Sequence, residues 1–135
     1  MSTIERINTF LKEAGTFYVA TVDAEGRPKN RPFGLHFLQD GKIYFGAGTF
    51  KDVYAQLKAD PHIEISANKG LEFIRYYGKA VMVDDDALVE KAFEVMPNLK
   101  KIYNEETGYK LGMFYIDEAT VEFRRLITLN EKIEL

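Results

Sequence analysis

The stretch DGKIYFGAGTFKDVYAQLKADPHIEISA, residues Asp40–Ala67, predicts a strand, a loop of small residues, a helix and a second strand. Residues Ile43–Gly46 are prone to form a strand, and the apolar residues from Phe50 onward repeat at helical spacing. The glycines of the loop leave room for a ligand against the backbone. We therefore expect Thr49 to be the N-cap of a helix that runs to about Ala59.

Lys51 lies in the expected first turn of this helix. A helix N-terminus carries unpaired N–H groups and a partial positive charge, so a lysine there is mildly unfavourable unless an anion lies nearby. A bound phosphate would supply that anion. The alternative is an ordinary surface lysine whose charge is offset by the adjacent Asp52, and the local pattern leaves both interpretations open.

The residues before this stretch predict a helix followed by a hairpin. Ser2–Ala14 has an apolar stripe, with Ser2 and Glu5 at capping-box spacing and Gly15 as the stop. Thr16–Asp23 alternates as a strand, and a turn containing glycine leads to a return strand, Pro32–Leu38. The Asp-Gly pair at positions 40 and 41 closes a second hairpin.

The residues after the stretch predict further strands and one more helix. A long strand, Leu71–Val83, is expected to bend or bulge at Gly78. Asp84–Asp86 precede a helix that ends near Met96, before a proline. The last expected strands are Met113–Ile116 and Thr120–Arg125.

The number and spacing of these elements predict the fold class. About six strands, mostly joined by hairpins, indicate a mainly β protein with peripheral helices, arranged as an antiparallel barrel or half-open barrel. Ten Phe and eight Tyr also favour a sheet. With 135 residues and no linker or repeat, we expect one domain over residues 1–135.

Composition excludes several classes of function. A formal charge of −3 without a Lys/Arg cluster makes nucleic acid a poor partner. The absence of cysteine excludes disulfides and thiol catalysis, and no apolar run approaches the ~20 residues that span a membrane. The start of the chain lacks the pattern of a signal peptide, so we expect a cytoplasmic protein without a membrane partner.

Three groups of polar residues are candidates for chemistry. Asp84–Asp86 have the oxygen ligands that divalent cations prefer, but acids before a helix favour capping, so we expect no metal site. His36 and His62 lack an identifiable serine or cysteine nucleophile nearby, which gives no support for a hydrolase. His62 is expected to be exposed, and His36 to face either a ligand or solvent.

Arg31 and Pro32 stand where the return strand is expected to begin. A proline there removes one ladder donor and leaves adjacent backbone groups free to meet a ligand or water. The fixed fork of an arginine suits an anion or a polar ring edge. The alternative is an edge-strand arginine bonded to a neighbouring carboxylate.

The order of these segments resembles the pyridoxamine 5'-phosphate oxidase-like family, the FMN-binding split barrels. The resemblance covers nearly the whole chain. It is carried by GRPKNRPFGLHF at residues 26–37, DGKIYF at 40–45, GTFKDVYAQL at 48–57, DPHIEIS at 60–66 and YYGKAVMV at 76–83.

This resemblance implies an antiparallel six-stranded split β-barrel that forms a homodimer, with one FMN in each of two clefts at the subunit interface. Thr49 and Lys51 match the residues that hold the flavin phosphate in the family. The strand Arg31–Gly34 matches the one along the isoalloxazine ring, and Phe45 and Gly46 match a strand end beside the cofactor. The expected cofactor-binding residues are therefore Arg31, Pro32, Phe33, Gly34, Phe45, Gly46, Thr49, Phe50 and Lys51.

The chain departs from true pyridoxamine-phosphate oxidases in two places. It has Phe50-Lys51 where they carry adjacent basic residues, and it ends in LITLNEKIEL, residues 126–135, without their C-terminal arginine and histidine pattern. We therefore do not expect oxidation of vitamin B6. The resemblance instead implies an FMN-dependent oxidoreductase that passes electrons or hydride to a small conjugated acceptor.

The alternative function is a non-catalytic protein of the same fold that binds or carries FMN or haem. No catalytic side chain is nominated, because the flavin would perform the redox chemistry. Tyr103, Tyr109 and Lys110 either cover the cleft or form an exposed connection, and the sequence leaves both interpretations open.

Overall fold

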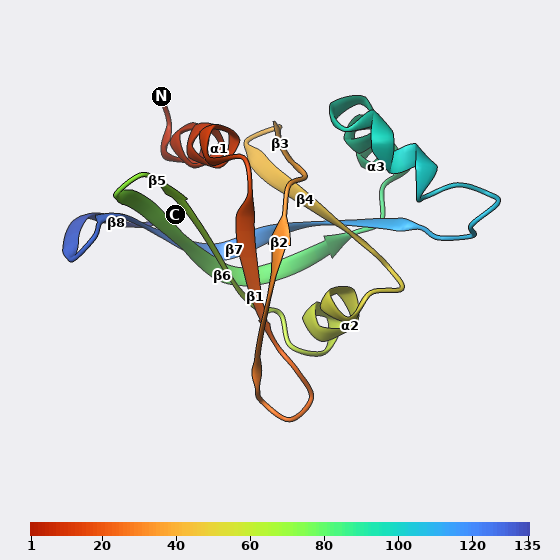
Figure 1. The fold of residues 1–135 in the computed structure, drawn as a ribbon, viewed down its shortest axis with the longest axis horizontal. Helices are drawn as coiled ribbons and strands as arrows, with labels where there is room; N and C mark the ends of the chain where they lie inside the picture. The colour runs from red at the N-terminus through yellow and green to blue at the C-terminus, as the bar shows by residue number, and fades with distance from the viewer.

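Eight antiparallel strands form one sheet that curls back on itself, with three α-helices packed around it (Figure 1). The computed structural model describes residues 1–135. The strands follow one another in the order β2-β1-β5-β6-β7-β4-β3, and β8 pairs with β7. Their bounds are β1 Phe17–Val22, β2 Pro28–Phe33, β3 His36–Gln39, β4 Lys42–Gly48, β5 His62–Lys69, β6 Glu72–Val83, β7 Leu111–Arg125 and β8 Thr128–Glu134.

The two ends of the sheet meet through side chains rather than through a ladder of hydrogen bonds. Strands β2 and β3 are separated by residues 34 and 35 alone, yet they stand at opposite ends of the strand order. Inside the curl, the ring of Phe17 lies 5.6 Å from that of Phe45, and the ring of Phe33 lies 6.5 Å from that of Phe114. The expected class, a mainly β split barrel with peripheral helices, is confirmed.

Helix α1 (Thr3–Ala14) closes one end of this core. The Ser2 side chain accepts from the N–H of Glu5, and the Glu5 carboxylate accepts from the N–H of Ser2, so the expected capping box is confirmed. Gly15, with φ of 83°, ends the helix. The face toward the barrel buries Ile7, Phe10 and Leu11.

The Asp-Gly hairpin is also confirmed. Asp40 and Gly41 have φ values of 51° and 77°, the left-handed backbone that a two-residue hairpin with a primed turn requires. The turn joins β3 to β4. The two strands pair antiparallel, with His36 opposite Phe45 at one end and Gln39 opposite Lys42 at the other.

The expectation of one return strand over Pro32–Leu38 was wrong. The chain pairs with β1 only as far as Phe33 and resumes at His36 in a different strand, which pairs with β4. An alternating pattern shows which residues are extended, but it does not show that the chain crosses from one end of the sheet to the other.

The expectation of Thr49 as an N-cap was also wrong. The Thr49 N–H donates to the carbonyl of Lys110 at 2.9 Å, which keeps this residue beside the segment that leads into β7. Helix α2 (Asp52–Ala59) therefore begins later, with the backbone of Lys51 as its N-cap and no side-chain cap.

The last strands differ in number from the expected ones. The register between β6 and β7 shifts at Gly78, which confirms the bulge, and a Cβ there would lie 2.5 Å from the carbonyl oxygen of Asp117. The two expected strands after Met113 form one strand, β7, with Glu118 at a φ of 49°. Strand β8 was not expected, and it brings the observed total to eight rather than about six.

Helix α3 (Asp86–Val95) follows β6 and packs against β7 and β3, on the upper right in Figure 1. The Asp85 side chain accepts from the N–H of Ala87, so the predicted capping role of the acidic run is confirmed. Pro97 begins a short 3-10 helix, η1 (Pro97–Lys101), that leads toward β7. None of the helices has the length and apolar character needed to cross a membrane.

Candidate functional site

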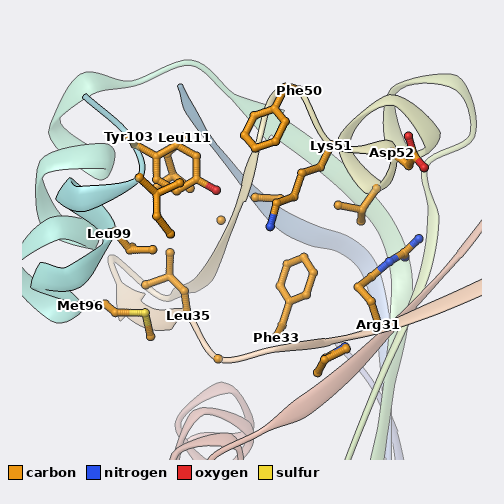
Figure 2. A pocket seen from close by; sticks show the side chains of 16 residues that line it. Arg31, Phe33, Leu35, Phe50, Lys51, Asp52, Met96, Leu99, Tyr103 and Leu111 are labelled. Carbon is orange, nitrogen blue, oxygen red and sulfur yellow. The ribbon is translucent and has the colours of Figure 1, made fainter. Parts of the chain in front are cut away.

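A cavity of about 720 Å³ opens where four parts of the chain meet. They are the β2–β3 bend, the end of β4, the first turn of α2, and the segment from the end of α3 to the start of β7 (Figure 2). The lining residues are Arg31, Pro32, Phe33, Gly34, Leu35, Gly46, Ala47, Phe50, Lys51, Asp52, Val53, Met96, Leu99, Ile102, Tyr103 and Leu111.

One end of the cavity is the N-terminus of α2. The Lys51 side chain extends into the cavity above the ring of Phe33 (Figure 2), and its ammonium group makes no ion pair with any carboxylate. The N–H groups of Asp52 and Val53 make no hydrogen bond to the protein outside their helix. Free donors, the helix dipole and a cation therefore converge at this end.

Arg31 lies beside the same end, and polar groups of two other elements hold its guanidinium. Nη1 donates to the carbonyl of Val19 at 3.2 Å and to Oγ1 of Thr21 at 2.7 Å. Nη2 donates to Oε1 of Gln56, in α2, at 3.0 Å. Partial burial lowers the pKa of Arg31, and the charge of nearby Asp52 opposes that shift. Arg31 does lie in an edge strand, β2, but the bonded carboxylate of the expected alternative is not found.

The opposite end of the cavity is apolar. Leu35, Met96, Leu99, Ile102 and Leu111 form its wall, with Tyr103 among them (Figure 2). Tyr103 is 8% exposed, and burial raises the pKa of its phenol above the ordinary value. Its hydroxyl points toward the cavity (Figure 2), and it is the one polar side-chain group at this end.

An aromatic pair forms the rim. The ring of Phe50 stacks on that of Tyr109, with centroids 4.0 Å apart and planes at 20°. Phe50 is nevertheless 50% exposed, so its other face meets solvent. Tyr103 thus lies in the cavity wall, whereas Tyr109, which stacks on Phe50, and Lys110 both line a neighbouring hollow.

The structure brings seven of the nine expected cofactor-binding residues to this cavity: Arg31, Pro32, Phe33, Gly34, Gly46, Phe50 and Lys51. The other two lie elsewhere. Phe45 is fully buried in the barrel core, on the strand face opposite its neighbour Gly46. Thr49 lines the neighbouring hollow beside Tyr54 and Lys110.

Sequence reasoning missed the wall that comes from α3, η1 and the start of β7. Met96, Leu99 and Ile102 are about 50 residues from Lys51 in the sequence, and no motif marks them. One usable signal was present: apolar residues recur at positions 96, 99 and 102 after the helix was expected to end.

The two histidines lie outside the cavity. Nδ1 of His36 is 2.8 Å from Oδ1 of Asn8 in α1, so His36 faces a helix rather than a ligand or solvent. Burial, and next the charge of Lys12, lower the pKa of His36. His62 is exposed, as expected, and bonds to the carboxylate of Asp60.

The chain and its fold are similar to those of known proteins. A family model described as pyridoxamine 5'-phosphate oxidase matches residues 3–122. A solved NimC/NimA family protein from Clostridium acetobutylicum is 31% identical, with a TM-score of 0.87 and 100% of this chain and 95% of that chain covered. A search of curated proteins finds no match.

Two more distant structures share the fold. A pyridoxamine 5'-phosphate oxidase-related, FMN-binding protein from Nostoc punctiforme is 18% identical, with a TM-score of 0.66 and 98% of this chain and 89% of that chain covered. A heme-binding protein from Mycobacterium smegmatis is 16% identical, with a TM-score of 0.72; the match covers 99% of this chain and 58% of that one.

Proposed function

This chain belongs to the pyridoxamine 5'-phosphate oxidase family, and from that premise we propose that it is an FMN-dependent oxidoreductase. FMN would bind in the cavity between β2, α2 and η1. The electrons would come from a reduced donor such as a nicotinamide dinucleotide and pass to a small conjugated acceptor. Oxidation of pyridoxamine phosphate itself is not proposed.

The residues at the cavity fit this cofactor. A cavity of about 720 Å³ lies within the range of ~300–1,000 Å³ typical of cofactor sites. Lys51 and the free N–H groups of Asp52 and Val53 suit a phosphate, because a helix N-terminus favours an anion. The ring of Phe33 and the small Gly34, at the β2–β3 bend, suit the face of a flat ring system.

When bound, FMN would supply the two-electron chemistry, so the side chains need only bind, orient and exclude water. Lys51 would neutralise phosphate charge, and Arg31, held by Thr21 and Gln56, would place a fixed positive charge beside the cofactor. Phe33 and the β2–β3 bend would exclude water from one face of the ring.

One observation carries the proposal: an unpaired lysine extends into a cavity of cofactor size at the N-terminus of a helix whose first N–H groups are free. The test is the affinity of the Lys51→Met variant for FMN and for riboflavin, which lacks the phosphate. Loss of a charged hydrogen bond of about 1.5–3 kcal/mol should weaken FMN binding about tenfold or more and leave riboflavin binding unchanged.

Lys58→Met is the matched control, because Lys58 lies in the last turn of α2, over the ring of Tyr54 and outside the cavity. It should bind FMN as the wild type does. Equal FMN affinity for the Lys51→Met variant and the wild type would contradict the assignment of the phosphate site.

We also propose that the cofactor site is completed by a second subunit in a homodimer. The stacked rings of Phe50 and Tyr109, at the edge of the cavity, are 50% and 46% exposed. Covering these apolar side chains would be favourable. Light scattering should give twice the monomer mass of 15.5 kDa, and a monomer mass with FMN bound would contradict this part of the proposal.

Turnover separates an enzyme from a carrier of FMN. An FMN-loaded protein that oxidises a reduced nicotinamide over many cycles, in the presence of a quinone, is an oxidoreductase. Tight FMN binding without turnover across several donors and acceptors would favour the carrier. Haem is the weaker candidate, because His36 and His62, the chain's two histidines, both lie outside the cavity.

A further inference from the structure

Resting on the proposed function, we propose a substrate class for the apolar end of the cavity. This end binds an uncharged, planar acceptor, and the Tyr103 hydroxyl donates a hydrogen bond to a carbonyl or similar oxygen of that acceptor. Acceptors that carry a phosphate, sulfonate or carboxylate are disfavoured there.

The side chains at the apolar end of the cavity disfavour a charged acceptor. Met96, Leu99 and Ile102 line the cavity, and the same short segment contributes no cation to it. Lys100 instead lies 5.9 Å from the centre of the Phe93 ring, and Lys101 is exposed outside the cavity. An anionic acceptor would therefore lose hydration at this end without gaining a partner.

Lys51 is the cation that extends farthest toward this end (Figure 2). In the FMN-loaded protein its charge is matched by the phosphate, so it does not compensate a second anion. Asp52, the one carboxylate at the cavity, lies at the α2 end (Figure 2). The apolar end is thus left without a net charge to attract an ionic substrate.

Tyr103 supplies the directional contact. Its side chain is 8% exposed and its hydroxyl points toward the cavity (Figure 2), with the hydroxyl oxygen hydrogen-bonded to the backbone of Gly48. Because burial raises the pKa of this phenol, the O–H bond stays intact near neutral pH. A neutral phenol can donate to a carbonyl oxygen, and its ring can pack against a conjugated one.

The test uses two matched probes, 1,4-naphthoquinone and 1,4-naphthoquinone-2-sulfonate, which share a ring and differ in one negative charge. Equilibrium dialysis against the full chain, saturated with oxidised FMN and without donor, measures binding rather than turnover. The chain has no cysteine that the quinone ring could alkylate. We expect the neutral probe to bind at least tenfold more tightly than the sulfonate.

Three variants test the residues. Tyr103→Phe keeps the ring and removes the hydroxyl, so it should weaken binding of the neutral probe about fivefold, the worth of one hydrogen bond. Ile102→Arg places a cation at a half-exposed wall position and should raise the affinity for the sulfonate at least fivefold. Ile102→Gln, similar in polarity but uncharged, should not raise it.

Flavin absorbance, recorded first on each variant, keeps the two proposals distinct. If FMN does not bind the wild type, the proposed function fails. The probes are then titrated into the FMN-free protein, and the methyl NMR signals of Met96, Leu99 and Ile102 are followed. Shifts of these signals by the neutral probe alone support the acceptor site. Equal affinity for both probes with FMN bound, or no methyl shifts without it, would overturn the acceptor site.

Discussion

The guanidinium of Arg31 donates to the hydroxyl of Thr21 across 2.7 Å, and Thr21 is 2% exposed. The Thr21 hydroxyl in turn donates to Oε1 of Gln56 at 2.5 Å, and that oxygen also receives Nη2 of Arg31 at 3.0 Å. This closed ring of hydrogen bonds joins β1, β2 and α2. It fixes the position of the arginine without using a carboxylate, so the positive charge stays available to a ligand.

Thr21→Val removes the hydroxyl and keeps the shape of the side chain. We expect the free energy of unfolding to fall by about 1–3 kcal/mol, because the hydrogen bonds of the hydroxyl to Arg31 and to Gln56 are both lost. FMN affinity should fall several-fold, because the guanidinium is less well held. Urea unfolding and FMN titration measure the two effects. Thr21→Ser should retain both properties, and FMN binding equal to wild type in the valine variant would show that Thr21 does not position Arg31.

Gly78→Ala tests the bulge between β6 and β7. The new Cβ would lie 2.5 Å from the carbonyl oxygen of Asp117, and backbone atoms cannot move aside as a flexible side chain does. We expect a loss of about 1–3 kcal/mol in unfolding free energy, the usual cost of overpacking, measured by urea denaturation. A stability equal to that of the wild type would mean that the bulge accommodates a methyl group.

Gly34→Ala is a contrasting change at the β2–β3 bend. A Cβ there would meet only the terminal methyl of Met96, at 3.7 Å, so unfolding free energy should change by less than about 0.5 kcal/mol. FMN affinity should fall several-fold, because Gly34 lines the cavity where the flavin ring is proposed to lie. If stability and FMN affinity were both unchanged, the ring would not lie against this bend.

Glu122 makes the stability dependent on pH. Its carboxylate accepts from the Tyr77 hydroxyl at 2.6 Å and from Nη1 of Arg124 at 2.6 Å, and these contacts hold its pKa below the ordinary 4.5. A carboxyl with a lower pKa in the folded state stabilises the fold above its unfolded pKa, and that stabilisation is lost as the pH falls through both values. The urea midpoint should therefore drop as the pH falls below about 5 and through the lower pKa of the folded state.

Glu122→Gln should reduce the fall of the urea midpoint at acid pH. Tyr77→Phe removes the largest cause of the pKa shift and should reduce this fall in part. The other carboxyls continue to titrate in both variants, so the comparison is the difference in slope from the wild type. A Glu122→Gln variant with the wild-type slope would show that the Tyr77 and Arg124 contacts do not contribute to acid stability.

Local signals in the sequence were sufficient where one short stretch determines the structure. The Ser2–Glu5 capping box, the Asp40–Gly41 turn and the Gly78 bulge each depend on a few adjacent residues, and all three are confirmed. The Thr49 cap failed because its N–H bonds to the Lys110 carbonyl, 61 positions away, and tertiary contacts override a local preference.

Contacts between distant segments, which the sequence does not show, limited the prediction of the site. The β2 and α2 contributions follow from motifs, but Met96, Leu99 and Ile102 reach the cavity only because α3 packs beside the start of β7. Strand β8 was missed because most of its side chains are exposed, so its sequence lacks the alternation of a half-buried strand. Both features depend on packing between distant segments rather than on local residue preference.

The most direct measurement is the visible absorption spectrum of the purified protein after incubation with FMN and desalting, recorded together with its mass in solution. We predict flavin bands equivalent to about one FMN per subunit on a species of twice the monomer mass. A colourless protein after desalting, which also fails to quench FMN fluorescence in a titration, would contradict the central claim that this cavity is a flavin site.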